Sequence, residues 1–151
     1  MHVYEAQISY TKTLFEVSSK QINTPEKAAE YFRDIVDEHP YQETVWVLLL
    51  DNKSHPLFRL MITKGTLTSC LVSPREVFMP ALISGAASVI LAHSHPSGDP
   101  SPSNADLQVT RSCREAGNIL GIPVVDHIIL GHAEMDPAGK GFYSFRSAGI
   151  L

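Results

Sequence analysis

The sequence predicts an α/β fold, in which a central mixed β-sheet carries helices packed on its faces. Apolar runs of strand length alternate along the chain with segments of helical periodicity, an order typical of sheets covered by helices. The 151 residues contain no internal repeat, low-complexity tract or linker that would divide them. We therefore expect one domain over residues 1–151, a length that buries enough surface for a single core.

Elements of the first half begin with residues 3–10, whose weak alternation predicts a strand. Thr24-Pro25 is typical of a helix start, with an N-cap and then proline at the first helical position. Apolar residues at helical spacing follow until His39-Pro40 ends the helix. The apolar run 44–50 predicts a buried strand, and 57–63 predicts its antiparallel partner across a short turn.

The middle of the chain predicts a third strand over residues 66–72 and then a helix. Ser73-Pro74-Arg75-Glu76 combines an N-cap, a proline at the first helical position and a glutamate at the third, which together favour a helix start. Pro80 falls about two turns into this helix and should kink or split it, because proline lacks the amide hydrogen that a helix interior uses.

The last elements alternate strand, helix, strand and strand. Residues 88–93 are short, apolar and β-prone, and residues 103–116 predict a helix closed by Gly117. Residues 123–130 predict another buried strand, and 142–145 a last short one.

Charge and composition exclude several classes of partner. The net charge is −4 with histidine neutral, and no run of lysine or arginine appears, so the protein as a whole does not attract nucleic acid or an anionic membrane. No stretch approaches the length of about 20 apolar residues that a membrane span needs, and the first residues do not resemble a signal peptide. We expect a cytoplasmic protein.

The chemically informative segment runs from His93 to Asp106. Residues two apart in an extended chain point to the same face, so His93 and His95 can aim both imidazoles at one point. A loop rich in proline and glycine follows, and Ser103 converts it into a helix whose first turn holds Asp106. Two histidines and one carboxylate suit zinc, and three protein ligands leave a position for water, as in catalytic sites. The segment predicts a mononuclear zinc site.

Each part of this segment also has an ordinary structural interpretation. Two histidines at a strand end can be surface residues, and Ser103 with Asp106 forms a common helix-start pattern in which the carboxylate stabilises the helix N-terminus. The combination of paired histidines, a rigid loop and a carboxylate is much less common than its parts. This combination favours the metal site.

The segment also carries a family resemblance. Residues 93–106 match the JAMM (MPN+) metalloprotease motif, H-[ST]-H-P-x6-S-x2-D, at every defined position, and the chain resembles more narrowly the JAB domain of bacterial RadC-like proteins. Further matches are Ser73-Pro74-Arg75-Glu76, Pro96-Ser97-Gly98-Asp99, Asp126-His127-Ile128-Ile129 and the ending Tyr143-Ser144-Phe145-Arg146 with Gly149. The resemblance covers about residues 24–151 and implies a single MPN/JAB-type, cytidine-deaminase-like domain. Residues 1–23 would then be an N-terminal extension, without the helix-hairpin-helix region that often precedes this domain.

The resemblance implies a zinc-dependent hydrolase, a metallopeptidase or isopeptidase that cleaves an amide bond in a peptide or protein. His93, His95 and Asp106 would bind one zinc ion per chain, and Ser103 would help to stabilise the oxyanion of the reaction.

A glutamate at the start of an upstream strand would act as general base. Glu43 occupies that place, immediately before the apolar run 44–50. Glu38 is the second candidate, although it falls in the preceding helical pattern.

Three neighbours have expected supporting roles. His127 follows Asp126 in an apolar strand, and we expect a structural or supporting histidine rather than a ligand. Thr110 lies one turn beyond Asp106, where it either orients that carboxylate or is a plain helix residue. Ser94 stands where RadC-like proteins usually have asparagine, and its side chain should point away from the metal.

Two other classes of function stay open. Metal-dependent nucleases and phosphoesterases also place His-x-His at a strand end, but they usually need two metals and ligands from several strands. A non-enzymatic interaction module, or a DNA-repair-associated metal-binding protein, would use the same fold without turnover. The net charge does not support DNA association, and the sequence predicts no oligomeric state.

Overall fold

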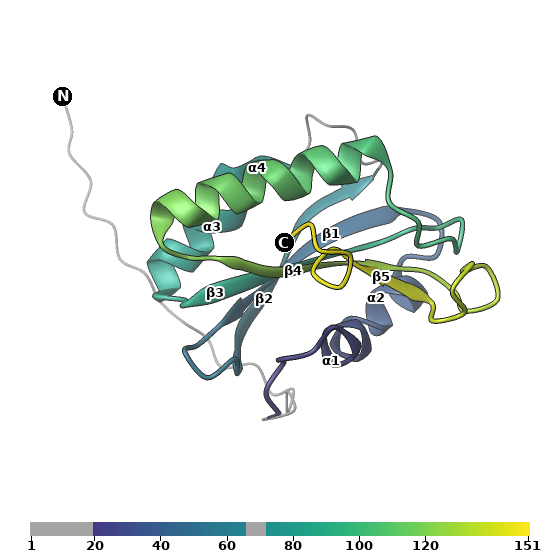
Figure 1. Cartoon of the computed structure of the whole chain (residues 1–151), viewed down its shortest axis with the longest axis horizontal. Helices are drawn as coiled ribbons and strands as arrows, with labels where there is room; N and C mark the ends of the chain where they lie inside the picture. Colours follow the sequence, from purple (N-terminus) through teal and green to yellow (C-terminus); the bar gives the residue numbers. More distant parts are fainter. Residues whose placement is uncertain (1–19, 66–71) are drawn as a thin grey trace.

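In the part of the chain that the structure describes, five strands form one sheet in the order β2-β1-β3-β4-β5 (Figure 1). The computed structural model describes residues 20–65 and 72–151. The strands are β1 Glu43–Leu50, β2 Pro56–Gly65, β3 Ser88–Ser94, β4 Val124–Leu130 and β5 Phe142–Ser144. β1 pairs antiparallel with β2 and β3, β3 pairs parallel with β4, and β4 pairs antiparallel with β5. The sheet is therefore mixed, and the predicted antiparallel pair of 44–50 and 57–63 is confirmed.

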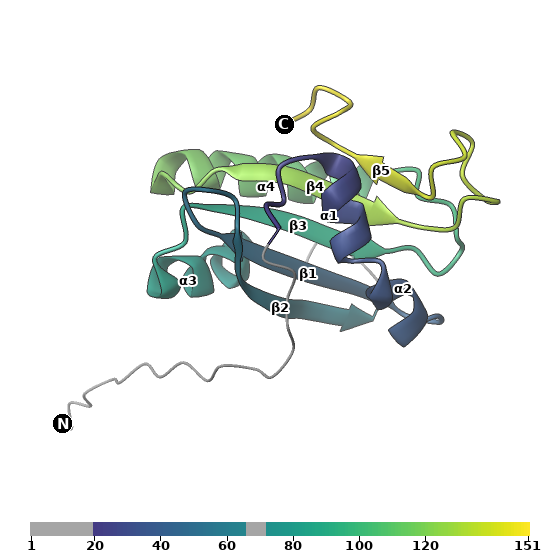
Figure 2. The ribbon, with the colours of Figure 1, turned by 90° about the horizontal axis from the view of Figure 1, so that it is seen from below.

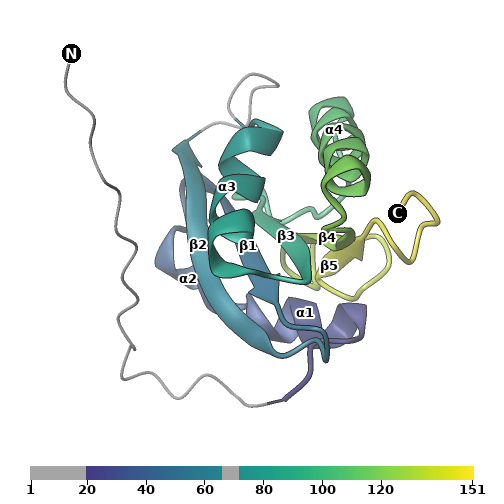
Figure 3. The same cartoon turned by 90° about the vertical axis from the view of Figure 1, so that its left-hand side faces the viewer.

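Helices cover both faces of this sheet. On one face lie α3 (Pro74–Ser84) and α4 (Asn104–Leu120), and on the other lie α1 (Pro25–Tyr31) and α2 (Asp34–Glu38) (Figures 1 and 3). Figure 2 shows α1 and α2 in front of the sheet when the molecule is seen from below. The predicted α/β class is confirmed. Within the described ranges, no helix is long and apolar enough to cross a membrane.

Alternation along the central strands divides the buried side chains into two cores. Val45, Val47 and Leu49 of β1 face α3 and α4, whereas Leu48 and Leu50 face α1 and α2. This period of two follows from the pleat of a strand, and burial on both faces explains why 44–50 is almost uninterruptedly apolar. In β3 the same alternation assigns Leu91, and hence His93, to the face of α3 and α4.

The helix predicted from Pro25 to His39 is split in the structure. α1 ends at Tyr31 and α2 begins at Asp34, because the intervening amides of Arg33, Ile35 and Val36 bond to carbonyls three residues back rather than four. The break lets Phe32 become fully buried and lets the Arg33 guanidinium reach the carbonyls of Gly131 and Gly141, at 2.8 and 3.2 Å. Tertiary contacts therefore override the local helical pattern.

The helix start at Ser73 is confirmed as a capping box, but of the expected kink or split at Pro80, the split does not occur. α3 runs continuously from Pro74 to Ser84 with Pro80 inside it. Proline removes the partner of the carbonyl four residues earlier, which belongs to Glu76. Glu76 is exposed, so water can satisfy that carbonyl and the helix continues.

The helix predicted over 103–116 is also longer than expected. α4 runs to Leu120 and ends at Gly121, whose φ of 70° is the left-handed conformation typical of a C-terminal cap. Gly117 lies inside the helix and is required for another reason. A Cβ atom there would lie 2.6 Å from the backbone oxygen of Ile122 and 3.1 Å from the Phe78 ring.

We expect Gly117→Ala to lower the free energy of unfolding by about 1–2 kcal/mol, because overpacking against a backbone oxygen outweighs the gain in helix propensity of about 1 kcal/mol. Urea unfolding measures the change. Ser112→Ala, at an exposed position of the same helix, is the control and should change stability by less than about 0.5 kcal/mol. A stabilised Gly117→Ala protein would show that propensity, not packing, decides this position.

Two sequence predictions fall outside the described residues. The strand predicted over 3–10 lies entirely outside them. Of the strand predicted over 66–72, only Val72 is described, and it is buried.

Candidate metal centre

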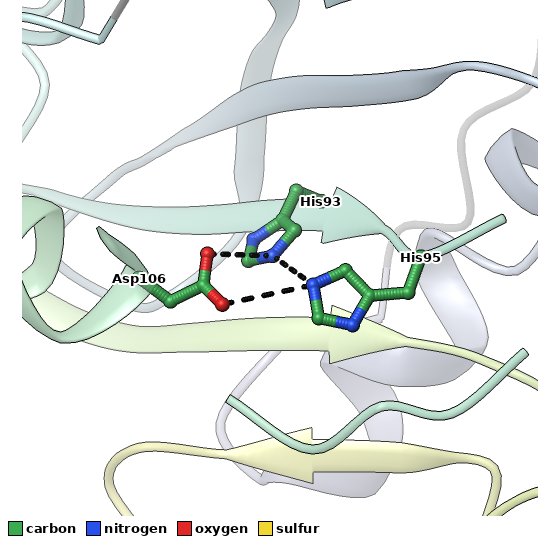
Figure 4. Close-up of side chains that lie close together, drawn as sticks. All are labelled: His93, His95 and Asp106. Carbon is green, nitrogen blue, oxygen red and sulfur yellow. Dashed lines mark hydrogen bonds and ion pairs between the residues drawn. The ribbon is translucent and has the colours of Figure 1, made fainter. Parts of the chain in front are cut away.

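The end of β3 brings the two histidines of the motif together. His93 is fully buried on the face covered by α4, and His95 follows the strand with its amide bonded to the Leu130 carbonyl of β4 at 2.9 Å. This bond keeps the chain extended past the end of β3, so residues two apart point the same way. The two Nε2 atoms lie 3.0 Å apart (Figure 4). The predicted convergence of His93 and His95 is confirmed.

The loop after His95 fixes the orientation of the His95 imidazole. Gly98 has a φ of 83° and bonds through its amide to the His95 carbonyl at 2.9 Å, while its own carbonyl accepts from His132 at 2.7 Å. Asp99 Oδ1 accepts from the Ser101 amide at 2.9 Å, a bond that stabilises the turn. The Asp99 carbonyl can only accept, so His95 Nδ1 donates to it at 2.8 Å and leaves Nε2 facing the site.

Asp106 combines the two roles that the sequence left open. Its Oδ2 atom accepts from the Ser103 amide at 2.6 Å and from the Ser103 hydroxyl at 2.7 Å, which completes the capping box of α4. Its Oδ1 atom is buried, lies 3.1 Å from His93 Nε2 and makes no hydrogen bond. Oδ2 therefore caps the helix and also lies 3.6 Å from His95 Nε2, whereas Oδ1 faces His93 without a hydrogen-bond partner.

The electrostatics of this cluster favour a bound cation. Burial by itself would raise the pKa of Asp106, but contacts with His93, His95 and Ser103 outweigh it and hold that pKa well below its usual range. Burial by itself would lower the pKa of His95, but Asp106, the Asp99 carbonyl and Glu43 raise it. The carboxylate is therefore ionised, and its surroundings stabilise positive charge at this point.

Glu43 lies at the edge of the site. It is the first residue of β1, and Val45 of that strand pairs with His93, so the antiparallel register continued by two residues places Glu43 opposite His95. Its Oε1 atom lies 3.8 Å from His95 Nε2, and its side chain is 24% exposed. Glu38, the second candidate for the base, ends α2 and is exposed.

Ser103 is an exposed residue at the entrance to α4. Its hydroxyl donates to Asp106 Oδ2 at 2.7 Å and accepts from the Asp106 amide at 3.2 Å. The structure thus brings it to the same cluster as the histidines, with its hydroxyl proton directed at the carboxylate.

Two further residues lie behind His93. His127 Nε2 lies 2.8 Å from His93 Nδ1, and His127 Nδ1 lies 2.7 Å from Thr110 Oγ1. His127 thus supports a member of the cluster, as expected. Of the two roles left open for Thr110, the structure shows neither, because its hydroxyl donates to the Asp106 backbone carbonyl at 2.6 Å rather than to the carboxylate and also contacts His127. Ser94 points to the opposite face, 3.3 Å from the Thr44 hydroxyl, as predicted.

With this geometry established, comparison with known proteins decides the family. The family model of the RadC-like JAB domain matches residues 22–150. The chain belongs to the RadC-like JAB family. Its described residues therefore belong to a single JAB domain, and the resemblance seen in residues 93–106 is confirmed at the level of the whole fold.

Relatives of this RadC-like JAB domain are UPF0758 proteins from several bacteria. One from Geobacter sulfurreducens is 42% identical over 135 residues, which cover 89% of this chain and 56% of the relative. One from Finegoldia magna is 40% identical over 127 residues, 84% of this chain and 56% of the relative. One from Symbiobacterium thermophilum is 44% identical over 109 residues, which cover 72% of this chain and 44% of the relative. The chain thus spans about half the length of these curated relatives.

In this RadC-like JAB domain, His93, His95 and Asp106 form a group that could hold a metal ion. One nitrogen or oxygen atom from each lies within 4.8 Å of the others (Figure 4). The buried, unpartnered Asp106 Oδ1 is the observation that tests the fit, because a buried polar atom without a partner costs free energy that a cation would recover. The residues present therefore fit a metal.

Proposed function

We propose that this RadC-like JAB domain is a zinc-dependent hydrolase that binds one zinc ion per chain and cleaves an amide bond, as a peptidase or isopeptidase. The observation that carries the proposal is Asp106 Oδ1, a buried carboxylate oxygen without a hydrogen bond beside His93 Nε2, which lies 3.0 Å from His95 Nε2. Such an arrangement is costly in a protein interior unless a cation joins the three groups.

The donor set favours zinc. Imidazole nitrogen and carboxylate oxygen are zinc ligands, and bonds of about 2.0–2.2 Å at tetrahedral angles separate neighbouring ligand atoms by about 3.3–3.6 Å. The two Nε2 atoms are 3.0 Å apart and Asp106 Oδ1 lies 3.1 Å from His93 Nε2, somewhat closer than in such a site, while Asp106 Oδ2 lies 3.6 Å from His95 Nε2. Three protein ligands are the number typical of catalytic rather than structural zinc sites. When bound, zinc supplies a Lewis acid that polarises a carbonyl and lowers the pKa of water to about 7.

Glu43 is proposed as the general base. Its carboxylate lies beside His95 but is partly exposed, so it can reach a water molecule and a substrate that enter from solvent. It would accept a proton from the attacking water and then donate that proton to the leaving amine.

Ser103 is proposed to stabilise the oxyanion that forms on the substrate carbonyl. For this its hydroxyl proton turns from Asp106 Oδ2 to the substrate oxygen, which its exposed position allows. The Ser103 amide stays bonded to Oδ2 at 2.6 Å, so α4 keeps a cap while the hydroxyl acts.

A peptide or protein is the proposed substrate, and a cytoplasmic location remains an expectation. Nucleases of the competing class usually hold two metals. In residues 20–65 and 72–151, a single group of three potential ligands is found, and this count favours the hydrolysis of amides.

The zinc content of the purified chain as a function of pH tests the proposal. We expect one zinc per chain at pH 8 and a loss of zinc as the pH falls. Protons compete for His95, whose pKa is raised above the ordinary 6.5, so its protonation and the release of metal begin at a higher pH than for a free histidine. Two zinc ions per chain would favour a nuclease, and none at pH 8 would overturn the proposal.

Activity is tested with the same zinc-loaded preparation on a peptide library and, in parallel, on single- and double-stranded DNA. Cleavage of peptides that stops when a chelator removes zinc supports the proposal. Cleavage of DNA alone, or zinc binding with no cleavage of either polymer, contradicts the amide-hydrolase assignment.

A further inference from the structure

A chain of buried hydrogen bonds leads from His93 away from the metal cluster. His93 Nδ1 lies 2.8 Å from His127 Nε2, His127 Nδ1 lies 2.7 Å from Thr110 Oγ1, and Thr110 Oγ1 lies 2.6 Å from the Asp106 backbone oxygen. The side chains of His93, His127 and Thr110 are all buried. With water excluded, each short contact needs one hydrogen between its two atoms.

The direction of the chain follows from its last member. A backbone carbonyl only accepts, so the single hydroxyl proton of Thr110 is donated to the Asp106 oxygen. Thr110 Oγ1 is then an acceptor toward His127, and His127 Nδ1 carries a proton. His127 is fully buried, with the Phe145 ring stacked on it at a centroid distance of 4.7 Å and an interplanar angle of 10°. A buried imidazole without a hydrogen-bonded carboxylate stays neutral, so its Nε2 atom is an acceptor.

Because His127 Nε2 is an acceptor, it fixes the tautomer of His93. The proton between the two rings must lie on His93 Nδ1, because His127 Nε2 has none to give. A neutral His93 then presents a bare lone pair at Nε2, the atom 3.0 Å from His95 Nε2 and 3.1 Å from Asp106 Oδ1. The opposite tautomer would place a hydrogen at Nε2 and block a metal bond.

His95 has the same Nδ1-protonated tautomer for a simpler reason, because its Nδ1 donates directly to the Asp99 backbone carbonyl in a loop. His93 has no such carbonyl at hand. It sits within β3, where neighbouring backbone carbonyls serve the ladders to β1 and β4. Instead, His127 of β4, which contacts Thr110 of α4, accepts the proton of His93 Nδ1.

We propose that Thr110 and His127 are positioning residues that fix the Nδ1-protonated tautomer of His93 and thereby direct its Nε2 lone pair to the metal. The inference rests on the proposed function for its metal, but the tautomer itself is defined without one. Thr110 also links the His93 tautomer to the position of Asp106, because its hydroxyl donates to the backbone carbonyl of Asp106, the third ligand. One hydroxyl therefore couples two of the three ligands.

The first test measures tautomers in the metal-free protein by 15N NMR of the imidazole rings at pH 8. We expect His93 and His127 both protonated at Nδ1 in the full chain. Thr110→Val removes the hydroxyl at nearly constant volume, and we expect a mixture of tautomers at both rings. Thr110→Ser restores the hydroxyl and should restore the single tautomer. A wild-type His93 protonated at Nε2 would overturn the proposal whether or not zinc binds.

The second test measures zinc affinity by competition with a chromogenic chelator. Loss of a residue that supports a metal ligand typically costs 10- to 100-fold in metal affinity. We expect Thr110→Val to weaken zinc binding about 10-fold and Thr110→Ser to bind within about threefold of wild type, with thermal unfolding confirming that each variant is folded. Equal affinity in Thr110→Val and wild type refutes the positioning role but leaves the zinc site in place. No zinc binding by wild type refutes the proposed function instead.

Discussion

We expect the replacement of Glu43 with glutamine to abolish amide hydrolysis and to leave one zinc bound per chain. Glutamine keeps the shape and volume of glutamate but cannot accept a proton at neutral pH. General acid–base catalysis contributes about 10²- to 10⁴-fold, so we expect turnover to fall by at least the lower figure. Glu43 lies 3.8 Å from His95 Nε2 at the edge of the cluster and outside the group of potential ligands, which is why the metal should stay. Steady-state cleavage of the best library peptide and zinc analysis of the same sample measure the two effects.

Glu38→Gln is the matched control for this variant. Glu38 precedes Glu43 by one short loop, is exposed at the end of α2 and was the second candidate for the base. We expect its replacement to leave both turnover and zinc content at the wild-type level. The assignment of the base is wrong if Glu43→Gln stays fully active, and it is reversed if Glu38→Gln is the inactive variant.

Replacing His95 with alanine should reduce the zinc content from one per chain to almost none under conditions that saturate the wild type. Two ligands hold zinc far less tightly than three, and the His95 nitrogen contacts both of the others, at 3.0 Å from His93 Nε2 and 3.6 Å from Asp106 Oδ2. His95 is the most informative ligand to remove. Its side chain is 12% exposed, whereas those of His93 and Asp106 are 1% exposed. Its loss therefore perturbs the core least.

His132→Ala controls for the general loss of a histidine near the site. His132 is exposed in the loop after β4, and its backbone rather than its ring bonds to Gly98. We expect this variant to keep one zinc. Metal analysis by mass spectrometry, combined with circular dichroism to check the fold, separates the cases. A folded His95→Ala protein that retains a full equivalent of zinc is incompatible with the ligand set.

Local sequence was sufficient to predict the core of the site. His93, His95, Ser103 and Asp106 lie in one short segment, and their geometry follows from the period of a strand and the capping of a helix. These are properties of neighbouring residues, so they can be recognised before any fold is known. The same holds for the buried strands around Leu48 and Ile128, whose apolar runs record burial on both faces of a sheet.

Tertiary structure alone decided the features that depend on contacts between distant residues. Glu43 is placed beside His95 by the antiparallel register of β1 and β3, and His127 is brought to His93 by the parallel register of β3 and β4. The sequence predicted a helix end at Gly117 because helix propensity is a local property. The structure shows instead that glycine is needed there because a Cβ atom would clash with the backbone oxygen of Ile122, which lies outside the helix. By itself the sequence determined which residues can bind a metal, since ligand type and short-range spacing are written in it. Which residues support and complete that group depended on strand register and packing, because these are set by the free energy of the whole chain rather than by any one segment.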